Sequence, residues 1–301
     1  MKHAVFPNVE PALAKEIILR EEAAYHASIA RAAEITLEKE ARFVFLAGPS
    51  CSGKTTTGKA LDEALEVAGK RVVTFSTDDF FFNEERAPLN EDGTPNYDAF
   101  EHTDSETILS VLGALSRGED AEIPIFDFNT GHRSDEVFPI SPKDYDVFIL
   151  EGIHALNDRI LEGMPKGEKW VCFYLDVTQG VAMEGQEPLL PTEIRFCRRL
   201  IRDYKHRNAG AERTFSLWKN VIPSEQEILH PFRKNATFTI DTNFPYEPAV
   251  EKQEVTELLA HVPPESPYYE KAQALWKKLM PFPAWEEALV PKNSVLQEFI
   301  D

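Results

Sequence analysis

Residues 43–55 read Phe-Val-Phe-Leu-Ala-Gly-Pro-Ser-Cys-Ser-Gly-Lys-Thr, and this stretch decides the fold. The run from Phe43 to Ala47 is short and apolar, which is typical of a buried strand. The eight residues after it match the pattern G-x-x-x-x-G-K-[ST], and a helical pattern extends from Lys54 to about Val67. A strand, a glycine-rich turn and a helix in this order present backbone N–H groups and a helix N-terminus to phosphate.

The residues of this turn have distinct expected roles in holding a nucleoside triphosphate. Lys54 reaches the outer phosphates, and the hydroxyl of Thr55 is placed to ligate Mg²⁺. The other nucleotide-binding candidates are Gly48, Ser50, Cys51, Ser52, Gly53 and Thr56. Cys51 could be a redox-sensitive thiol beside a helix N-terminus, although a small residue that fits the loop is the simpler interpretation.

Strand and helix patterns alternate along the rest of the chain. We expect strands at Arg71–Ser76, Ile123–Phe126, Asp146–Leu150, Trp170–Leu175 and Phe238–Ile240, and helices at Asp104–Ser116, 192–206 and Pro248–His261. Residues 83–98 are polar, contain Pro and Gly, and predict a long surface loop. The alternation indicates an α/β fold, with a mostly parallel sheet covered by helices on both faces.

Two extensions flank the expected phosphate-binding domain at residues 42–262. Residues 1–41 are rich in Ala, Glu, Ile and Leu from Pro11 onward, and predict one or two helices. Residues 263–301 hold several prolines between aromatic residues, and predict one helix (about Tyr268–Leu279) and then an extended tail that lies on the domain.

Acidic residues follow three of the predicted strands. Because ligands bind beyond the carboxyl ends of parallel strands, these side chains are candidates for the active site. Asp78, the first acid after its strand, is the candidate base that orients or deprotonates an attacking hydroxyl. Glu151 is the candidate carboxylate on the Mg²⁺ side. For Asp176, a helix or turn cap is at least as good an interpretation as a functional role.

A basic stretch lies between Arg195 and Arg213, with seven Lys and Arg residues against two acids. Arg195, Arg199 and Arg202 have the spacing of one helix face. Arginine clusters suit phosphate binding and the stabilisation of a transferred phosphoryl group, whereas an exposed helix balanced by acidic neighbours is the simpler alternative. The flexible residues 208–211 favour a closing lid near 195–213.

The overall composition narrows the classes of partner. The 301 residues include 32 Lys and Arg against 51 Asp and Glu, a formal charge of −19. This charge argues against binding to nucleic acid or to anionic lipid. No apolar run reaches the roughly 18 residues of a membrane span, and the start of the chain lacks the apolar part of a secretory signal. We therefore expect a cytoplasmic protein with reduced thiols at Cys51, Cys172 and Cys197. The oligomeric state stays open, and a homo-oligomer is compatible with the sequence.

Taken together, these segments resemble the uridine kinase/phosphoribulokinase family of P-loop kinases, and within it the bacterial uridine kinase-like branch. The resemblance covers about residues 42–260. It rests on GPSCSGKTT, STDDFF, NYDAFEH, PIFDFNTGHRS, VFILEGIHALND, RRLIRDYKHRNAG with WKNV, HPF and NFPYE. It implies a three-layer P-loop NTPase fold. It also implies an enzyme that uses ATP and Mg²⁺ to phosphorylate a hydroxyl, typically the 5′-hydroxyl of uridine or cytidine.

The resemblance also assigns roles to individual residues. Asp78 in STDDFF matches the family's base, Asp98 in NYD matches the acid that holds the ribose hydroxyls, and Glu151 in EGI matches the metal-side carboxylate. Three arginines match the lid arginines of the family. Arg202 is expected to contact the transferred phosphoryl group together with Lys54, Arg207 to contact the nucleotide, and Arg199 to contact the acceptor.

Departures from the family pattern concern the acceptor pocket. Phe126 stands where nucleoside kinases often have Tyr, so one hydroxyl is missing. His132 matches the histidine that reads the pyrimidine, but Gly131 shifts the local alignment, and Asn208-Ala209 replaces a Gly-Arg pair. Two alternatives therefore stay open. The acceptor could be another hydroxyl compound, such as a sugar phosphate or a pantothenate-like molecule, or the chain could be a nucleotide-binding regulatory protein without catalysis.

Overall fold

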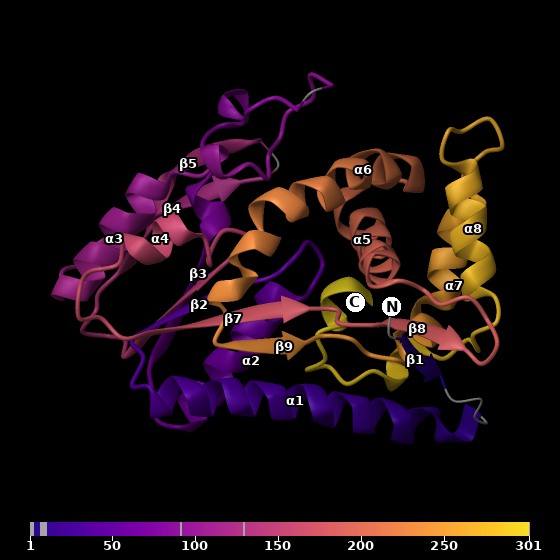
Figure 1. Cartoon of the computed structure of the whole chain (residues 1–301), viewed down its shortest axis with the longest axis horizontal. Coiled ribbons are helices and arrows are strands. Elements are labelled where there is room, and N and C mark those ends of the chain that lie inside the picture. The colour runs from indigo at the N-terminus through magenta and orange to yellow at the C-terminus, as the bar shows by residue number, and fades with distance from the viewer. Residues whose placement is uncertain (1–2, 7–10, 91, 129, 301) are drawn as a thin grey trace.

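A computed structural model describes residues 3–6, 11–90, 92–128 and 130–300. Its centre is a five-stranded sheet with the strand order β3-β6-β2-β7-β9, in which every pair is parallel (Figure 1). The strands are β2 (Phe43–Ala47), β3 (Val72–Ser76), β6 (Val147–Glu151), β7 (Trp170–Asp176) and β9 (Phe238–Asp241). The first strand of the sequence pattern, β2, thus lies in the middle of the sheet.

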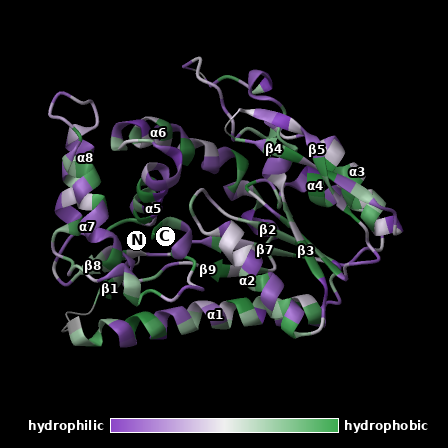
Figure 2. Cartoon of the chain, turned by 180° about the vertical axis from the view of Figure 1, so that it is seen from behind, coloured by the Kyte–Doolittle hydropathy of each residue, from purple (hydrophilic) through white to green (hydrophobic). Residues whose placement is uncertain are grey.

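Helices cover both faces of this sheet, because alternate residues of the buried strands point to opposite sides. From β2, Val44 and Leu46 join the core cluster that contains α1 (Ala14–Glu38) and α2 (Lys54–Val67). Phe43 and Phe45 join the cluster that contains α3 (Ser105–Arg117) and α4 (Asp158–Glu162). The central strands are mostly apolar (Figure 2), and both β2 and β6 are buried along their whole length. The predicted three-layer α/β fold is confirmed.

The remaining helices form a group beside the carboxyl end of the sheet (Figure 1). They are α5 (Pro191–Arg207), α6 (Ala211–Ile228), α7 (Glu247–Ala260), α8 (Tyr269–Leu279) and α9 (Gln297–Ile300). Helix α5 contacts α6, α7 and α9, and is the centre of this group. Short 3₁₀ turns complete the set: η1 (Pro11–Leu13), η2 (Thr77–Phe80), η3 (Glu84–Arg86), η4 (Phe100–His102), η5 (His230–Asn235) and η6 (Glu287–Leu289).

Both extensions pack on the core. Residues from Ala14 onward form the single long helix α1, and β1 (His3–Phe6) pairs in parallel with β8 (Gly180–Met183). The prediction of an extended tail after α8 was wrong at its end, because the chain closes with α9. The apolar side chains of Phe299 and Ile300 are buried there, and their burial favours a helical turn over an extended end.

Several elements were absent from the predicted set. Strand β5 (His132–Ile140) pairs antiparallel with β4 (Ala121–Asp127) in a two-stranded ribbon outside the main sheet, and β5 is mostly exposed. Helix α6 escaped prediction although it has eighteen residues, and it contains Pro223 in its interior. Within the described residues, no helix is both long enough and apolar enough to cross a membrane.

Candidate active site

The register of the parallel strands brings the sequence-predicted residues to one edge of the sheet. Glu151 at the end of β6 is aligned with Leu46 in β2 and with Ser76 in β3. Consequently the turn after β2, the turn after β3 and the Glu151 carboxylate lie side by side at the carboxyl end. This edge is where a parallel sheet binds its ligand.

The turn after β2, residues 48–55, is here called the phosphate loop. A Cβ on Gly48 would lie 2.6 Å from the Ser52 Oγ and 2.9 Å from Leu175, so only glycine fits there. Gly53 has φ +84° and Cys51 has φ 58°, both in the left-handed region. The Lys54 Nζ donates to the Pro49 carbonyl at 3.2 Å and so closes the loop. The loop is therefore tightly curved.

A carboxylate already accepts one backbone N–H group of the phosphate loop. The Ser50 N–H donates to the Glu225 carboxylate at 2.9 Å, which shows that this amide is directed at a negative charge. The Ser52 hydroxyl is buried within the loop and has no hydrogen-bond partner. Free donors and a carboxylate that stands in for an anion fit the predicted binding of a triphosphate.

The metal-side residues are in contact. The Thr55 hydroxyl donates to Glu151 at 3.3 Å. Burial, together with the negative charges of Asp78 and Glu298, raises the pKa of Glu151 to about 7, against the opposing charge of Lys54. No cluster of three or more metal-binding side chains occurs in the described parts of the chain. Two protein oxygens suit Mg²⁺, which usually keeps several waters and substrate phosphates as its remaining ligands.

The two acids after β3 have different surroundings. Asp79 accepts the Ser76 N–H at 3.3 Å and the backbone N–H of Phe126, and so caps the 3₁₀ turn η2. Within the described parts of the chain, the Asp78 carboxylate instead accepts only the neighbouring Thr77 hydroxyl, at 3.3 Å. Burial raises the pKa of Asp78, and the positive charge of Lys54 opposes that rise. Asp78 is thus the carboxylate that remains available beside the phosphate loop.

Asp98 lies in the same group although it comes from the long loop before η4. Burial raises the pKa of Asp98; Arg199 and Lys54 act against the rise, while Asp78 and Glu225 add to it. These mutual effects place Asp98 within electrostatic reach of the predicted base and of the phosphate loop.

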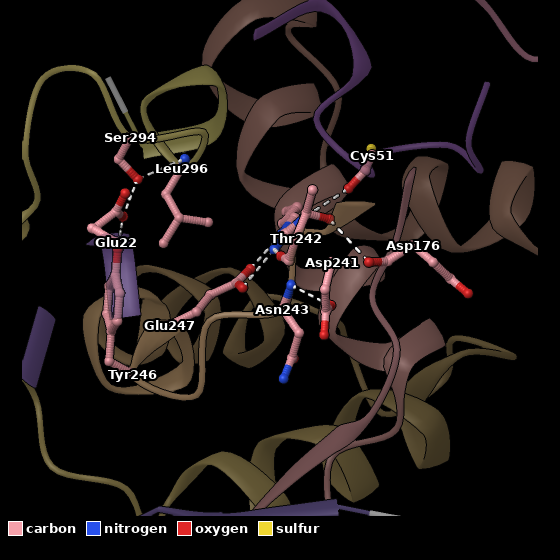
Figure 3. Close-up of polar contacts among 11 residues, drawn as sticks. Glu22, Cys51, Asp176, Asp241, Thr242, Asn243, Tyr246, Glu247, Ser294 and Leu296 are labelled. Carbon is pink, nitrogen blue, oxygen red and sulfur yellow. Dashed lines mark hydrogen bonds and ion pairs between the residues drawn. The ribbon is translucent and has the colours of Figure 1, made fainter. Parts of the chain in front are cut away.

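Two arginines of α5 donate hydrogen bonds to backbone carbonyls of the phosphate loop. Arg195 forms a two-pronged ion pair with Glu225, at 2.7 and 2.8 Å, and donates to the Ser50 carbonyl at 2.9 Å. Arg198 is completely buried, pairs with Glu247, and donates to the Cys51 carbonyl at 3.2 Å and to the Thr242 carbonyl at 2.6 Å. Figure 3 shows Cys51, Thr242 and Glu247 converging on this point. Both arginines are therefore structural supports of the loop.

The three arginines with predicted ligand roles are less engaged. Arg199 donates to the Ser50 hydroxyl at 3.2 Å and to Asp203 at 3.2 Å. The Arg202 Nε is buried without a hydrogen-bond partner, although its guanidinium lies 3.6 Å from Asp203. The Arg207 side chain is 53% exposed at the end of α5. Arg202 and Arg207 are within electrostatic reach of Cys51 in the phosphate loop, where a bound phosphate could accept their donors.

Two of the predicted acceptor residues, Phe126 and His132, lie on the β4–β5 ribbon. Phe126 is buried, with its ring centroid 5.7 Å from that of Phe81 and 5.1 Å from that of Phe128. His132 is at the rim, where its ring contacts Glu85 at 2.7 Å and the Thr130 carbonyl at 2.7 Å. Phe126 therefore packs beside η2, whereas His132 lies at the exposed rim of the ribbon.

Asp176 does not join this group. Its carboxylate pairs with Arg233 at 2.8 Å, and its carbonyl accepts the Thr242 N–H at 2.9 Å. Asp176 is the last residue of β7, and within the described residues its carboxylate forms an ion pair and caps neither a helix nor a turn.

Sequence reasoning missed Glu225 and Glu298, both of which bond to the nucleotide site. Glu225 is 175 positions from Ser50, and Glu298 is 242 positions from its partner Thr56. No local pattern marks either residue, because each is an ordinary helical glutamate until the chain folds.

The chain is similar to known kinases in sequence and in fold. A uridine kinase from Staphylococcus epidermidis is 30% identical over 196 residues, which cover 65% of this chain and 84% of the relative. A uridine kinase from Anoxybacillus flavithermus is 28% identical over 205 residues, covering 68% and 87% of the two chains. A solved structure of a candidate fructose transport system kinase from Silicibacter sp. TM1040 matches with a TM-score of 0.50 and 18% identity, over 70% of this chain and 98% of that one. That last likeness concerns the fold alone.

The family model described as phosphoribulokinase/uridine kinase matches residues 43–248, which include the phosphate loop, Asp78, Asp98, Glu151 and α5. This chain is an ATP-dependent kinase of a small molecule and belongs to the phosphoribulokinase/uridine kinase family.

Proposed function

We propose that this kinase transfers the γ-phosphoryl group of Mg·ATP to the 5′-hydroxyl of a pyrimidine nucleoside, uridine or cytidine. The observation that carries the proposal is the grouping of Asp78 and Asp98 beside Lys54 at the mouth of the phosphate loop. One acid is placed to act on the reacting hydroxyl and the other to hold neighbouring hydroxyls, which is what a ribose requires.

Each residue has a definite part in this reaction. The phosphate loop and Lys54 hold the triphosphate, and Arg202 and Arg207 neutralise its outer charge. Asp78 accepts the proton of the acceptor hydroxyl as that oxygen bonds to the γ-phosphorus and the bond to the β–γ bridging oxygen breaks. Thr55 and Glu151 would hold Mg²⁺, which supplies charge stabilisation on the β- and γ-phosphates.

The charges near the ribbon favour an acceptor without a phosphate. A sugar phosphate needs free cationic donors, and Arg133 is already committed. Arg133 donates to the carbonyls of Phe80 and Phe81, both at 2.7 Å, and pairs with Asp104 at 3.1 Å. The Asp98 carboxylate, which lies near Asp78, would also repel a second phosphate. A neutral nucleoside suits this surface better.

The retained base argues against a purely regulatory role. A protein that only binds nucleotide needs the phosphate loop but has no use for an uncommitted carboxylate at Asp78. The neighbouring Asp79, in contrast, already has a structural role, because it accepts the Ser76 N–H and caps η2.

A panel of acceptors tests the proposal. The protein is incubated with Mg·ATP and, separately, uridine, cytidine, a purine nucleoside, a pentose phosphate and pantothenate, and ADP release is measured. Acceptor-dependent turnover with uridine or cytidine is expected. Turnover confined to the pentose phosphate or pantothenate would replace the proposed acceptor, and ATP binding without turnover on any acceptor would support the regulatory alternative.

A further inference from the structure

The last residues of the chain lie against the nucleotide site, beyond the part matched by the family model. Residues 294–300 are here called the C-terminal segment. A Cβ placed on Gly53 would collide with Val295, so this segment touches the phosphate loop directly. Val295 and Leu296 are fully buried, which makes the contact part of the core.

Three anchors fix the C-terminal segment. Ser294 donates to the buried Glu22 carboxylate at 2.5 Å, and Tyr246 donates to the same oxygen (Figure 3). The ring of Phe299 lies 5.4 Å from the guanidinium carbon of the buried Arg198. At the far end, the Ile300 carbonyl accepts the Lys205 Nζ at 2.5 Å. The segment is thus held to α1 and α5 at once.

Glu298 makes the one polar contact from this segment to the first turn of α2 that the described residues include. It accepts the Thr56 hydroxyl at 2.7 Å. Thr56 follows Lys54 and Thr55 directly, so its side chain belongs to the turn whose N–H groups face the phosphates. The Glu298 carboxylate is also close enough to affect Glu151 on the metal side.

We propose that Glu298 is a positioning residue of the nucleotide site, and that the C-terminal segment is a fixed wall of that site. By accepting the Thr56 hydroxyl from a segment anchored at both ends, Glu298 holds the first turn of α2 in the orientation that receives the triphosphate. This proposal rests on the proposed binding of Mg·ATP at the phosphate loop, and it is independent of which acceptor is used.

The contact predicts a specific pattern among variants of two residues. Glu298→Ala removes the acceptor and should raise the Kd for Mg·ATP about tenfold, the size expected for loss of a hydrogen bond to a charged group. Glu298→Gln should restore most of the affinity, because its amide oxygen can accept the Thr56 hydroxyl. At saturating ATP, kcat should change much less than KM for ATP.

A double-mutant cycle tests whether Glu298 acts through Thr56. Thr56→Val should weaken Mg·ATP binding, and adding Glu298→Ala to it should have no further effect, because the partner hydroxyl is already gone. Glu265→Gln, at an exposed acid of the same extension, is the matched control and should bind as the wild type does. Affinities are measured by titration calorimetry on the full chain, with denaturant midpoints for every variant.

Three results would overturn the proposal: an unchanged Kd in Glu298→Ala, additive losses in the double variant, or a Glu298→Gln variant as weak as Glu298→Ala. The last would show that the charge matters and the hydrogen bond does not. Should Glu298→Ala prove unstable, the Kd of Glu298→Gln, which keeps the hydrogen bond, can still be compared with the Kd of Thr56→Val, which lacks it. Wild-type protein that binds Mg·ATP but phosphorylates no acceptor would contradict the proposed function and leave this proposal standing.

Discussion

Asp78 and Asp79 are adjacent carboxylates that the fold uses differently. Asp79 accepts two backbone N–H groups and caps η2, whereas Asp78 faces Lys54 across the site. The difference comes from the tight 3₁₀ turn, which points successive side chains in different directions. A base must be free to take a proton, and only Asp78 meets that condition.

Replacement of these two acids should therefore have unequal effects. Asp78→Asn should lower turnover by about 10²-fold or more and leave Mg·ATP binding nearly unchanged, because the amide cannot accept the hydroxyl proton. Asp79→Asn is the control, since its amide oxygen can still accept the N–H of Ser76. Steady-state kinetics and calorimetry measure the two effects. Turnover that survives in Asp78→Asn would remove Asp78 from the role of base.

Glu151 makes the ligand-free protein sensitive to pH. Its pKa is raised from 4.5 to about 7, chiefly by burial. Between these values the folded protein holds a proton that the unfolded chain has released, so stability falls as pH rises through this window. The loss attributable to Glu151 is about 3 kcal/mol.

Urea unfolding in the presence of a chelator checks this dependence. From about pH 5 to about pH 8, the wild type should lose about 3 kcal/mol more of its unfolding free energy than Glu151→Gln, which cannot ionise. Equal slopes for the two proteins would show that Glu151 is ionised throughout this range.

Among the secondary-structure elements, α5 and α6 hold the phosphate loop through hydrogen bonds. All three polar groups of Ser50 are engaged by these helices: the N–H by Glu225, the carbonyl by Arg195 and the hydroxyl by Arg199. The first turns of the predicted lid are therefore joined to the core. Helix α5 ends at Arg207, whose side chain is about half exposed, and the left-handed Asn208 follows it.

The buried Arg195–Glu225 pair should respond differently to single and double replacement. Arg195→Met leaves an unpaired buried carboxylate and should cost about 3–5 kcal/mol of unfolding free energy, whereas Arg195→Met with Glu225→Leu should cost much less. The exposed pair Arg117–Glu119 is the control, and Arg117→Met should change stability by less than about 1 kcal/mol. Denaturant titrations compare the variants. A double variant as unstable as the single one would mean that the pair itself, and not the orphaned charge, stabilises the loop.

At the scale of the whole molecule, the two extensions are part of one core. Helix α1 contributes Ile18, Tyr25 and Ile29 to the cluster that contains the central strands. Tyr25 also bonds to Thr57 of α2 at 2.9 Å, while Glu22 joins α1 to the C-terminal segment. The nucleotide site is thus supported from both ends of the chain.

Deletion of residues 1–41 should accordingly prevent stable folding, because it uncovers the apolar face of α2 and of β9. The expected result is an aggregating protein, or one that binds a hydrophobic dye and lacks a cooperative thermal transition. A soluble 42–301 fragment with the wild-type melting temperature would show instead that the extension is a separate appendage.

The sequence by itself determined the strand, turn and helix around residues 43–67, because periodicity and glycine placement are local properties. It also placed Asp78 and Glu151 at strand ends, since apolar runs show where buried strands stop. It did not predict β5, because this exposed strand depends on pairing with β4 and has only a weak pattern of its own. It also missed the proline-containing α6 and the final turn α9, because tertiary burial stabilises these two helices more than local propensity does.

Only the tertiary structure decided which polar groups meet. It separated the structural Arg195 and Arg198 from Arg199, Arg202 and Arg207, although all five lie on one helix and look alike in sequence. It also brought Glu225 and Glu298 to the phosphate loop from distant parts of the chain. Such contacts depend on the packing of whole helices, and no pattern of neighbouring residues encodes that packing.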